Sequence, residues 1–438
     1  MKNILIIDGN YFGHRLLHGM RGSAKEITLD SLEEQANFAS GLNNSMLNIY
    51  ASFNNEWHTL LDNIVFVFDN ESWRKTIPGF RPYYITIDSA EKIGYKDNRE
   101  DLKAESNINW DNFNKLMNEF YERLNPYIPC FRVVGCEGDD AFLLLRDHLK
   151  DEDIKLWLFA TDGDLSQLVN QKTLLFKNVS SKVSPDGEYY ISEQTYSAIF
   201  NQKVDMLSLL SKPQPNRLHY FDMFKVQLNG GRARSQAERK PNVNIFVAEP
   251  LLTGLIKTIC GDKKDNVFPL FRWVKNGKNY KVTEKMLGDV WKLNGFGELC
   301  EATAVKFFLD KNIQITTLVG LIMKAQSNQI EKIDKQMVLD HYRHNLKVII
   351  LRKENLPEHV KTLFVGEFLL KKDKIMNTFS IQDMLKINLT TETIDSATEL
   401  QISSVPSQTK INNPSDSQTA YMDIPDENKS LIDDILNA

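Results

Sequence analysis

Short apolar runs that are each followed by an acidic residue recur in the first part of the chain, and this pattern restricts the fold most strongly. The runs span residues 3–7, 64–68, 130–134 and 155–160. Their richness in Ile, Val, Leu and Phe is typical of strands buried on both faces. Helical patterns at 110–124 and 140–149 lie between the later runs. This alternation predicts an α/β fold with a parallel sheet.

The acidic residues that follow these runs should lie close together. The carboxyl ends of parallel strands share one edge of a sheet, where ligands bind. We assign nine acids to one site there: Asp8, Asp69, Glu137, Asp139, Asp140, Asp162, Asp164, Asp262 and Asp265. Since neighbouring carboxylates raise one another's pKa, such a cluster needs cations. None of these clusters contains a histidine, which favours two Mg²⁺ ions, with Mn²⁺ as a substitute, over zinc.

Each acidic motif also has a simpler interpretation when taken alone. The Glu137-Gly-Asp139-Asp140 stretch could be an acidic helix N-terminus, and the shorter motifs could be turns. Their coincidence at successive strand ends favours a shared metal site. Two such ions support phosphodiester hydrolysis. The motifs of nucleophile-elbow hydrolases, P-loop enzymes and dinucleotide-binding enzymes do not occur in the sequence.

The charge distribution suits a phosphate-rich partner. The net charge of the 438 residues is −5, but residues 391–438 hold nine acids and two lysines, which leaves +2 for the rest of the chain. With nine acids assigned to metal, that remainder is basic. The four cysteines form no C-x-x-C pair, and the first apolar run is too short for a signal peptide or a membrane span. We therefore expect a cytoplasmic protein with no membrane association.

Basic and aromatic residues alternate in the segment after Asp69. They are Trp73, Arg74, Lys75, Arg81, Tyr83, Tyr84, Tyr95, Lys96 and Arg99. Such a segment can stack an unpaired base while its cations hold phosphates. The alternative is a solvated surface. A second basic stretch, 230–240, has the composition of a loop, and duplex contact there is only weakly supported.

The composition changes twice along the chain. After residue 195 the patterns are helical, at 251–260, 302–309 and 318–323. From about residue 390 the chain is acidic and rich in Ser, Thr, Asn and Gln, which is typical of disorder. We expect three parts: a nuclease-type domain at 1–195, a mostly helical domain at 196–375, and an acidic disordered tail at 376–438.

The order and spacing of these motifs resemble the flap-endonuclease family of structure-specific 5′-nucleases. The stretches 95–99, 161–164 and 256–267 are most similar to the T-even-phage type of ribonuclease H. The resemblance covers about residues 1–365 and is specific as a set of motifs. It implies a parallel-sheet, PIN-like domain with a helical arch at about 71–105, followed by a helical duplex-binding domain. A phage origin, with the host cytoplasm as location, would agree with it.

The resemblance also implies roles for single residues. Asp8, Asp69, Glu137 and Asp139 would serve the first metal, and Asp140, Asp162, Asp164, Asp262 and Asp265 the second metal or the shell between the two. Lys96 and Arg99 would contact the reacting phosphate, so that they join Asp162 and Asp164 as catalytic residues. Tyr95 or another aromatic residue of the arch would stack on the terminal base. Further nucleic-acid contacts would come from Arg74, Lys75 and Arg81.

The implied activity is that of a metal-dependent 5′→3′ exonuclease and flap endonuclease. It would remove RNA primers, as a ribonuclease H does, and 5′ flaps from duplex DNA in replication or repair. The family usually has a glycine-rich helix–three-turn–helix, sometimes with K⁺, directly after Gly-Asp-x-x-Asp-Asn. Here Gly295-Phe-Gly297 follows only after a longer gap, so the chain departs from the family pattern where the duplex contacts and the K⁺ site would lie.

The expected partners are RNA–DNA hybrids and flap or branched duplex DNA, bound by a monomer. The apolar and acidic stretch 430–436 would suit a docking peptide for a sliding clamp or a single-strand-binding protein, or else an ordinary terminal helix. Two other functions stay open. A PIN-type RNA endonuclease would be far shorter, and a non-catalytic junction-binding scaffold would be expected to lack one or more of the acids.

Overall fold

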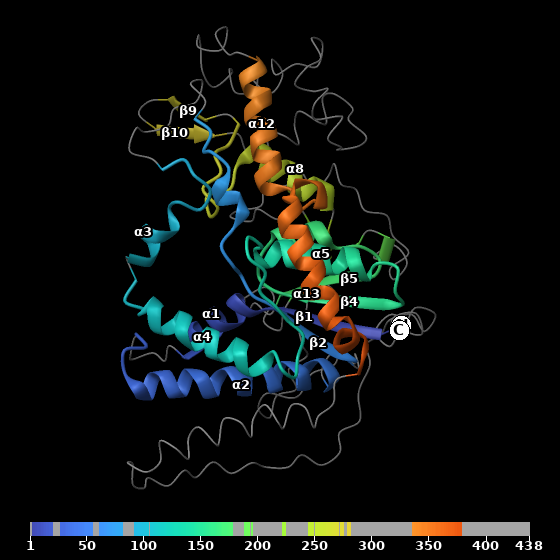
Figure 1. Cartoon of the computed structure of the whole chain (residues 1–438). Helices are drawn as coiled ribbons and strands as arrows, with labels where there is room; N and C mark the ends of the chain where they lie inside the picture. The colour runs from blue at the N-terminus through green and yellow to red at the C-terminus, as the bar shows by residue number, and fades with distance from the viewer. Residues whose placement is uncertain are drawn as a thin grey trace.

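An eight-stranded sheet forms the centre of the fold (Figure 1). The computed structural model describes residues 2–20, 27–55, 61–81, 92–104, 106–177, 188–192, 194–195, 221–224, 244–248, 250–270, 272–275, 278–281 and 335–378. The strand order is β3-β2-β1-β4-β5-β6-β8-β7. The strands are β1 (Lys2–Asp8), β2 (Asn63–Val67), β3 (Cys130–Phe131), β4 (Ile154–Phe159), β5 (Thr173–Lys177), β6 (Glu188–Ser192), β7 (Phe221–Phe224) and β8 (Asn244–Ala248).

The four strands that the apolar runs predict are all present, and the parallel sheet is confirmed. Strand β1 lies between β2 and β4 and is parallel to both. The pairs β2 with β3 and β4 with β5 are parallel as well. Antiparallel pairs occur only further along the described sheet, where β5 meets β6 and β7 meets β8. The carboxyl ends of the five parallel strands therefore meet at one edge.

Both faces of the sheet are covered, which explains why its strands are continuously apolar. Leu5 and Ile7 belong to one core cluster, whereas Ile4 and Ile6 belong to the other. This division follows from the alternation of side chains along a strand. The first cluster includes residues of α1 (Gly9–Met20), α2 (Leu32–Asn55) and α4 (Trp110–Leu124). The second includes residues of α5 (Gly138–Leu149) and α13 (Glu358–Met376), so the sheet is a middle layer.

Shorter elements carry the segments that surround the edge of the sheet. A 3₁₀ helix, η1, spans Trp73–Thr76, and α3 spans Arg99–Ala104; these lie in the two described parts of the expected arch, with residues 82–91 and 105 outside the described residues. A second 3₁₀ helix, η2 (Asp164–Leu168), follows β4. Figure 1 shows α3 set apart from the sheet.

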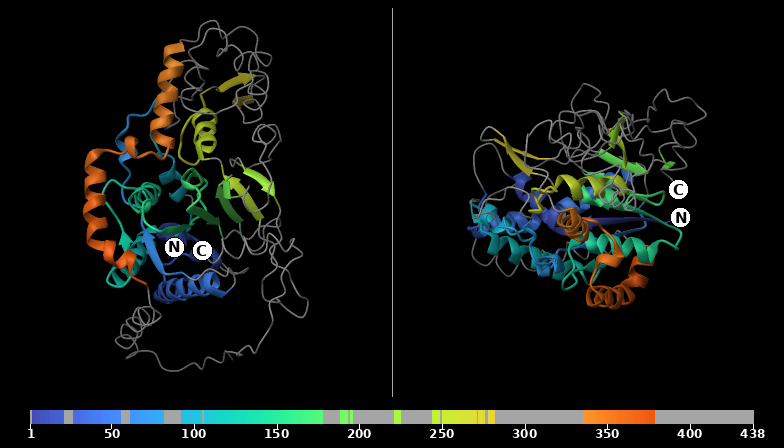
Figure 2. Two further views of the ribbon diagram at one scale, coloured as in Figure 1. Left: turned by 90° about the vertical axis from the view of Figure 1, so that its right-hand side faces the viewer. Right: turned by 90° about the horizontal axis from the view of Figure 1, so that it is seen from above.

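The described segments after residue 195 include strands as well as the expected helices. Helix α8 (Pro250–Cys260) matches the pattern at 251–260 and packs against η2 and α12 (Lys335–Ile349). Strands β9 (Arg272–Lys275) and β10 (Lys278–Lys281) form a hairpin, and η4 (Lys353–Asn355) follows α12. Helices α12 and α13 follow one another along one side of the molecule (Figure 2).

The sheet does not end at the boundary expected at residue 195. Strand β8 pairs with both β6 and β7, so strands from both sides of that boundary belong to one sheet. Helix α13 packs on α5 through Phe364 and Phe368, which stack on His148. The helical patterns at 302–309 and 318–323, the basic stretch 230–240, the glycines near 295 and nearly all of the expected tail lie outside the described residues. Within the described part, no helix is long and apolar enough to cross a membrane.

Candidate metal centre

Asp8 and Asp69 meet at the ends of neighbouring strands. Asp8 is the last residue of β1 and lies opposite Val67 of β2. Asp69 Oδ1 accepts a hydrogen bond from the amide of Gly138, the first residue of α5, at 2.7 Å. Asp69 Oδ2 accepts one from Asn10 Nδ2 at 3.1 Å. The two strands and the positively polarised N-terminus of α5 thus converge on these carboxylates.

Burial and mutual repulsion destabilise the ionised form of both carboxyl groups. Burial, followed by the charge of Asp69, raises the pKa of Asp8 to about 8, against the hydrogen bond from the Tyr11 amide. Burial also raises the pKa of Asp69. The charge of Asp162 also raises the pKa of Asp8. Asp8 and Asp69 therefore belong to the same electrostatic cluster as the acids after β4.

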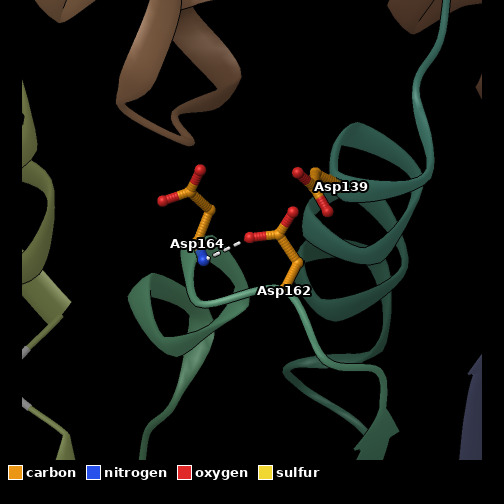
Figure 3. Close-up of side chains that lie close together, drawn as sticks. All are labelled: Asp139, Asp162 and Asp164. Carbon is orange, nitrogen blue, oxygen red and sulfur yellow. Dashed lines mark hydrogen bonds between the residues drawn. The ribbon is translucent and has the colours of Figure 1, made fainter. Parts of the chain in front are cut away.

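The first candidate metal group consists of Asp139, Asp162 and Asp164. One carboxylate oxygen of each lies within 4.8 Å of the others. Asp139 comes from the first turn of α5, and the other two from the turn between β4 and η2 (Figure 3). The amide of Asp164 donates to Asp162 Oδ1 at 2.9 Å, which fixes the turn. Burial and then the charges of Asp162 and Asp164 raise the pKa of Asp139 well above its usual range.

The second candidate group consists of Asp164, Asp262 and Asp265, again with one oxygen of each within 4.8 Å of the others. Asp164 is therefore shared by the two groups. Asp262 and Val267 exchange backbone hydrogen bonds of 2.9 and 2.8 Å, which close the loop after α8. Gly261 permits this closure, because its φ is +73° and a Cβ there would lie 2.5 Å from the amide nitrogen of Pro269.

Lys257 is a residue of the centre that the sequence motifs did not identify. Its ammonium lies 2.5 Å from Asp164 Oδ1 and 2.8 Å from Asp262 Oδ2, and the residue is 4% exposed. Burial alone would raise the pKa of Asp162, but Lys257, the hydrogen bond from the Asp164 amide and the charges of Lys177 and Lys96 together lower that pKa to about 2. Burial and neighbouring acids still raise the pKa of Asp164 to about 7. The sequence feature that could have identified Lys257 is its position inside an apolar helical pattern, five residues before Asp262.

Glu137 and Asp140 are engaged by side chains of the arch rather than grouped with the other acids. Asp140 accepts from both terminal nitrogens of Arg74, at 2.9 and 2.7 Å, and from Trp73 Nε1 at 3.0 Å. Glu137 accepts from Arg74 at 2.9 Å, from the Tyr95 hydroxyl at 3.0 Å, and from Lys96. Neither acid belongs to a candidate metal group among the described residues.

The charges around Glu137 keep it ionised. Burial by itself would raise its pKa, but Lys96 and Arg74 lower it overall. Glu137 and Asp140 also form a reciprocal capping box at the start of α5, where Asp140 Oδ2 accepts from the amide of Glu137 at 3.3 Å. The structure therefore gives these two acids a role in holding the helix and the arch together.

The expected nucleic-acid residues fall into two groups. Arg74 and Tyr95 are buried, with 2% and 9% exposure, so neither side chain lies at the surface. Lys75 and Arg81 are exposed. Arg99 is half-exposed, and its NH2 lies 3.0 Å from Asp265 Oδ1. Tyr83 and Tyr84 lie outside the described residues.

Lys96 lies between the two sides of the centre. Its ammonium contacts Glu137 and lies 3.9 Å from Asp265 Oδ1. Opposing carboxylates outweigh burial and raise its pKa above its usual range. Its backbone has a φ of +59°, and its amide donates to the carbonyl of Asp265 at 3.0 Å. The side chain is thus held close to the acids as a permanent cation.

The donor set fits hard divalent ions. Both candidate groups offer carboxylate oxygens alone, which suits magnesium or manganese better than zinc. The raised pKa values of Asp8, Asp139 and Asp164 mark carboxylates whose charge the protein compensates incompletely. A bound cation would supply the missing positive charge.

Solved structures give only weak likenesses to the chain. The zinc-bound 5′-exonuclease of bacteriophage T5 is 16% identical, with 84% of this chain and 99% of that one covered and a TM-score of 0.47. The bacteriophage T5 flap endonuclease in complex with DNA and metal ions is 15% identical, with 89% and 100% covered and a TM-score of 0.44. Human GEN1 in complex with Holliday junction DNA is 10% identical, with 98% and 86% covered and a TM-score of 0.39. At these TM-scores the likenesses carry no argument, and no curated protein sequence matches the chain.

The family comparison is more direct. Residues 3–199 match the model of the 5′-3′ exonuclease N-terminal resolvase-like domain. The match covers β2 to β6 and nearly all of β1, together with the arch and seven of the nine predicted acids. It indicates a nuclease that acts on phosphodiester bonds. Residues 3–199 of the chain are thus similar to the N-terminal resolvase-like domain of 5′-3′ exonucleases.

Proposed function

We propose that the protein is a divalent-metal-dependent 5′→3′ exonuclease and flap endonuclease that removes RNA primers and 5′ flaps from duplex DNA in replication or repair. The observation that carries this proposal is that two acidic groups share the buried Asp164, with Lys96 and Arg99 beside Asp265. This arrangement combines sites for two cations with fixed positive side chains for a phosphate.

Asp139, Asp162 and Asp164 would hold one ion, and Asp164, Asp262 and Asp265 the other. Bound divalent ions supply Lewis acidity to phosphodiester hydrolysis. We propose Mg²⁺ as the natural ion and Mn²⁺ as a substitute, because the donors are all carboxylates. Asp8 and Asp69 extend the negative field around the first group, while Glu137 and Asp140 orient the arch. This assignment differs from the one that the family resemblance implies, in which Glu137 and Asp140 serve the metals.

The cationic side chains would act on the phosphate. Lys96 and Arg99 lie on the leg of the arch at 92–104 and face Asp265. When a phosphate enters, each can exchange a carboxylate contact for a phosphate oxygen and stabilise the negative charge that develops there. No covalent nucleophile is needed. Lys75 and Arg81 are exposed on the other leg and are candidates for contacts with the substrate backbone.

The remaining parts of the proposal concern the second half of the chain, much of which lies outside the described residues. Residues 196–375 would bind duplex DNA, with or without K⁺ near residue 295. The acidic tail would tether a docking peptide at 430–436 for a sliding clamp or a single-strand-binding protein. Deleting residues 425–438 and measuring clamp binding in a pull-down tests this part, since unchanged binding would remove it. We further propose a monomer in the cytoplasm, similar in type to the T-even-phage ribonuclease H.

A substrate comparison tests the proposed function. The 5′-labelled substrates are an RNA–DNA hybrid, a 5′-flap duplex and an unpaired strand, each incubated in Mg²⁺ or in chelator and resolved on a denaturing gel. We expect short labelled products from the hybrid and the flap in Mg²⁺ alone. Binding to the flap without cleavage in either buffer would instead support the non-catalytic scaffold. Preferential cleavage of the unpaired RNA strand would support the PIN-type RNA endonuclease.

A further inference from the structure

The two candidate metal groups differ in how much positive charge the protein itself provides. In the second group, Lys257 contacts Asp164 and Asp262 at 2.5 and 2.8 Å. The third member, Asp265, lies 3.0 Å from Arg99 NH2 and 3.9 Å from the ammonium of Lys96. Three side-chain cations therefore surround three carboxylates.

The first group makes fewer ion pairs with lysine or arginine side chains. Asp139 and Asp162 form no ion pair with any lysine or arginine of the described residues, and only the shared Asp164 touches a cation. Since the strength of cation binding rises with uncompensated negative charge, the first group should attract a divalent ion more strongly. Within the described part of the chain, Asp139 and Asp162 also have no side-chain donor that an arriving ion would have to displace.

We propose that Lys257 is an internal counter-ion that competes with a divalent cation for the second acidic group. The ammonium contacts an oxygen of Asp164 and one of Asp262, and each of these carboxylates is also a candidate metal ligand. An ion that uses both must share or displace the ammonium. The first group then fills first, and the centre holds one ion at rest. This inference rests on the proposed metal-dependent function and adds a positioning residue to it.

The location of Lys257 makes this competition specific. The side chain enters from α8, which packs against η2, the element that begins with Asp164. It is buried, so water cannot replace the contacts that it makes to the acids. A buried ammonium is tolerated only when carboxylates pair with it, and the same carboxylates need a cation when no metal is bound. Lys257 and a metal ion therefore serve as alternative partners for one group.

Isothermal titration calorimetry of the metal-free full-length protein with Mn²⁺ tests the proposal. We compare the wild type with Lys257→Met, which keeps the length of the side chain but removes its charge. The larger of the two dissociation constants for Mn²⁺ should fall on the order of tenfold or more in this variant. It should return toward the wild-type affinity in Lys257→Arg. In the double variant Lys257→Met/Asp265→Asn the tightened event should be lost.

Lys264→Met is the matched control. Lys264 is exposed in the loop after α8 that carries Asp262 and Asp265. Its replacement by Met removes the same net charge as Lys257→Met but leaves the contacts to Asp164 in place. If Lys264→Met tightens Mn²⁺ binding as much as Lys257→Met does, the effect is one of net charge and the proposal is wrong. The proposal is also wrong if Lys257→Met binds Mn²⁺ with wild-type affinities.

Thermal unfolding separates metal competition from a merely structural role. In chelator, Lys257→Met should unfold at a lower temperature than the wild type, because two buried carboxylates lose their partner. Mn²⁺ should raise its Tm by more than it raises that of the wild type and restore most of the loss. If the loss is equal with and without Mn²⁺, or the variant does not fold in either buffer, Lys257 only supports the fold. If the wild type binds no Mn²⁺ at all, it is the proposed metal-dependent function that fails.

Discussion

Arg74 is a buried cation that joins the start of the arch to the first turn of α5. Its neighbours Trp73 and Lys75 form a basic and aromatic segment that predicts contact with phosphate. In the structure the guanidinium is buried against Glu137 and Asp140, and its Nε donates to the carbonyl of Val348 at 2.8 Å. These partners lie at least 63 positions away along the chain, so no local pattern could have indicated them.

The burial of Arg74 leads to a prediction about stability. Arg74→Met should lower the free energy of unfolding by about 3–5 kcal/mol, because it leaves two buried carboxylates without a partner. Lys75→Met, at the exposed neighbouring position, should change it by less than about 0.5 kcal/mol. Urea titrations of both variants in chelator measure the difference. A variant Arg74→Met with wild-type stability and weakened flap binding would instead support the phosphate role.

His14 allows a prediction of how stability depends on pH. Its ring stacks on Phe113 at 4.8 Å, and burial lowers its pKa to about 4 from an ordinary value near 6.5. Below that ordinary value the unfolded chain takes up a proton that the folded protein resists. The contribution of His14 is therefore complete above pH ~6.5 and is lost as the pH falls toward 4.

The His14→Phe variant tests this dependence. Phenylalanine preserves an aromatic ring against Phe113 but cannot titrate. Urea titrations between pH 7 and pH 4 should show a smaller loss of unfolding free energy for the variant than for the wild type. Equal slopes in the two proteins would mean that His14 is protonated as readily in the folded state as in the unfolded chain.

At the scale of elements, the periodicity of the sequence predicted the four strands and the helices α4, α5 and α8, because each has a pattern within itself. It did not predict that β8 joins the sheet between β6 and β7 or that α13 packs on α5. These arrangements depend on contacts between distant segments, which local periodicity does not contain. For the same reason, the boundary expected at residue 195 did not anticipate that β8 pairs with β6 across it.

The arch and the loop of the second acidic group are joined by hydrogen bonds from both backbones and side chains. Asn266 Nδ2 donates to the carbonyls of Lys92 and Gly94, each at 2.9 Å. The residue has a φ of +58°, a conformation that asparagine tolerates better than most residues. The amide of Lys96 donates to the carbonyl of Asp265. The position of Lys96 therefore depends on the same loop that carries Asp262 and Asp265.

Asn266→Ala should slow flap cleavage more than it weakens Mn²⁺ binding. The change removes both contacts to the arch leg, and a displacement of about 1 Å at a reacting group costs on the order of 10²-fold in rate. Asn98→Ala is the control, since Asn98 makes one longer bond of 3.3 Å to the carbonyl of Lys263. Single-turnover rates for the two variants provide the comparison. Wild-type cleavage by Asn266→Ala would show that the arch leg is held independently of this loop.

At the scale of the whole molecule, the parallel sheet explains why acids distant in sequence become neighbours. The sequence predicted the gathering of Asp8, Asp69, Asp139 and Asp162, because acids at the carboxyl ends of adjacent strands must share an edge. It did not separate the acids that pair with Arg74 from those that group for metal, since that depends on which cations the arch and α8 bring in. Lys257 went unrecognised for the same reason.

The central claim is that Asp164, shared by the two acidic groups, belongs to a catalytic metal centre. The most direct measurement is the single-turnover rate of 5′-flap cleavage in Mg²⁺ by Asp164→Asn, with flap affinity measured by fluorescence anisotropy in chelator. The exposed Asp151→Asn variant serves as the control. We expect a loss of rate of at least about 10²-fold with little change in affinity. Cleavage by Asp164→Asn at the wild-type rate would contradict the assignment of these acids to catalysis.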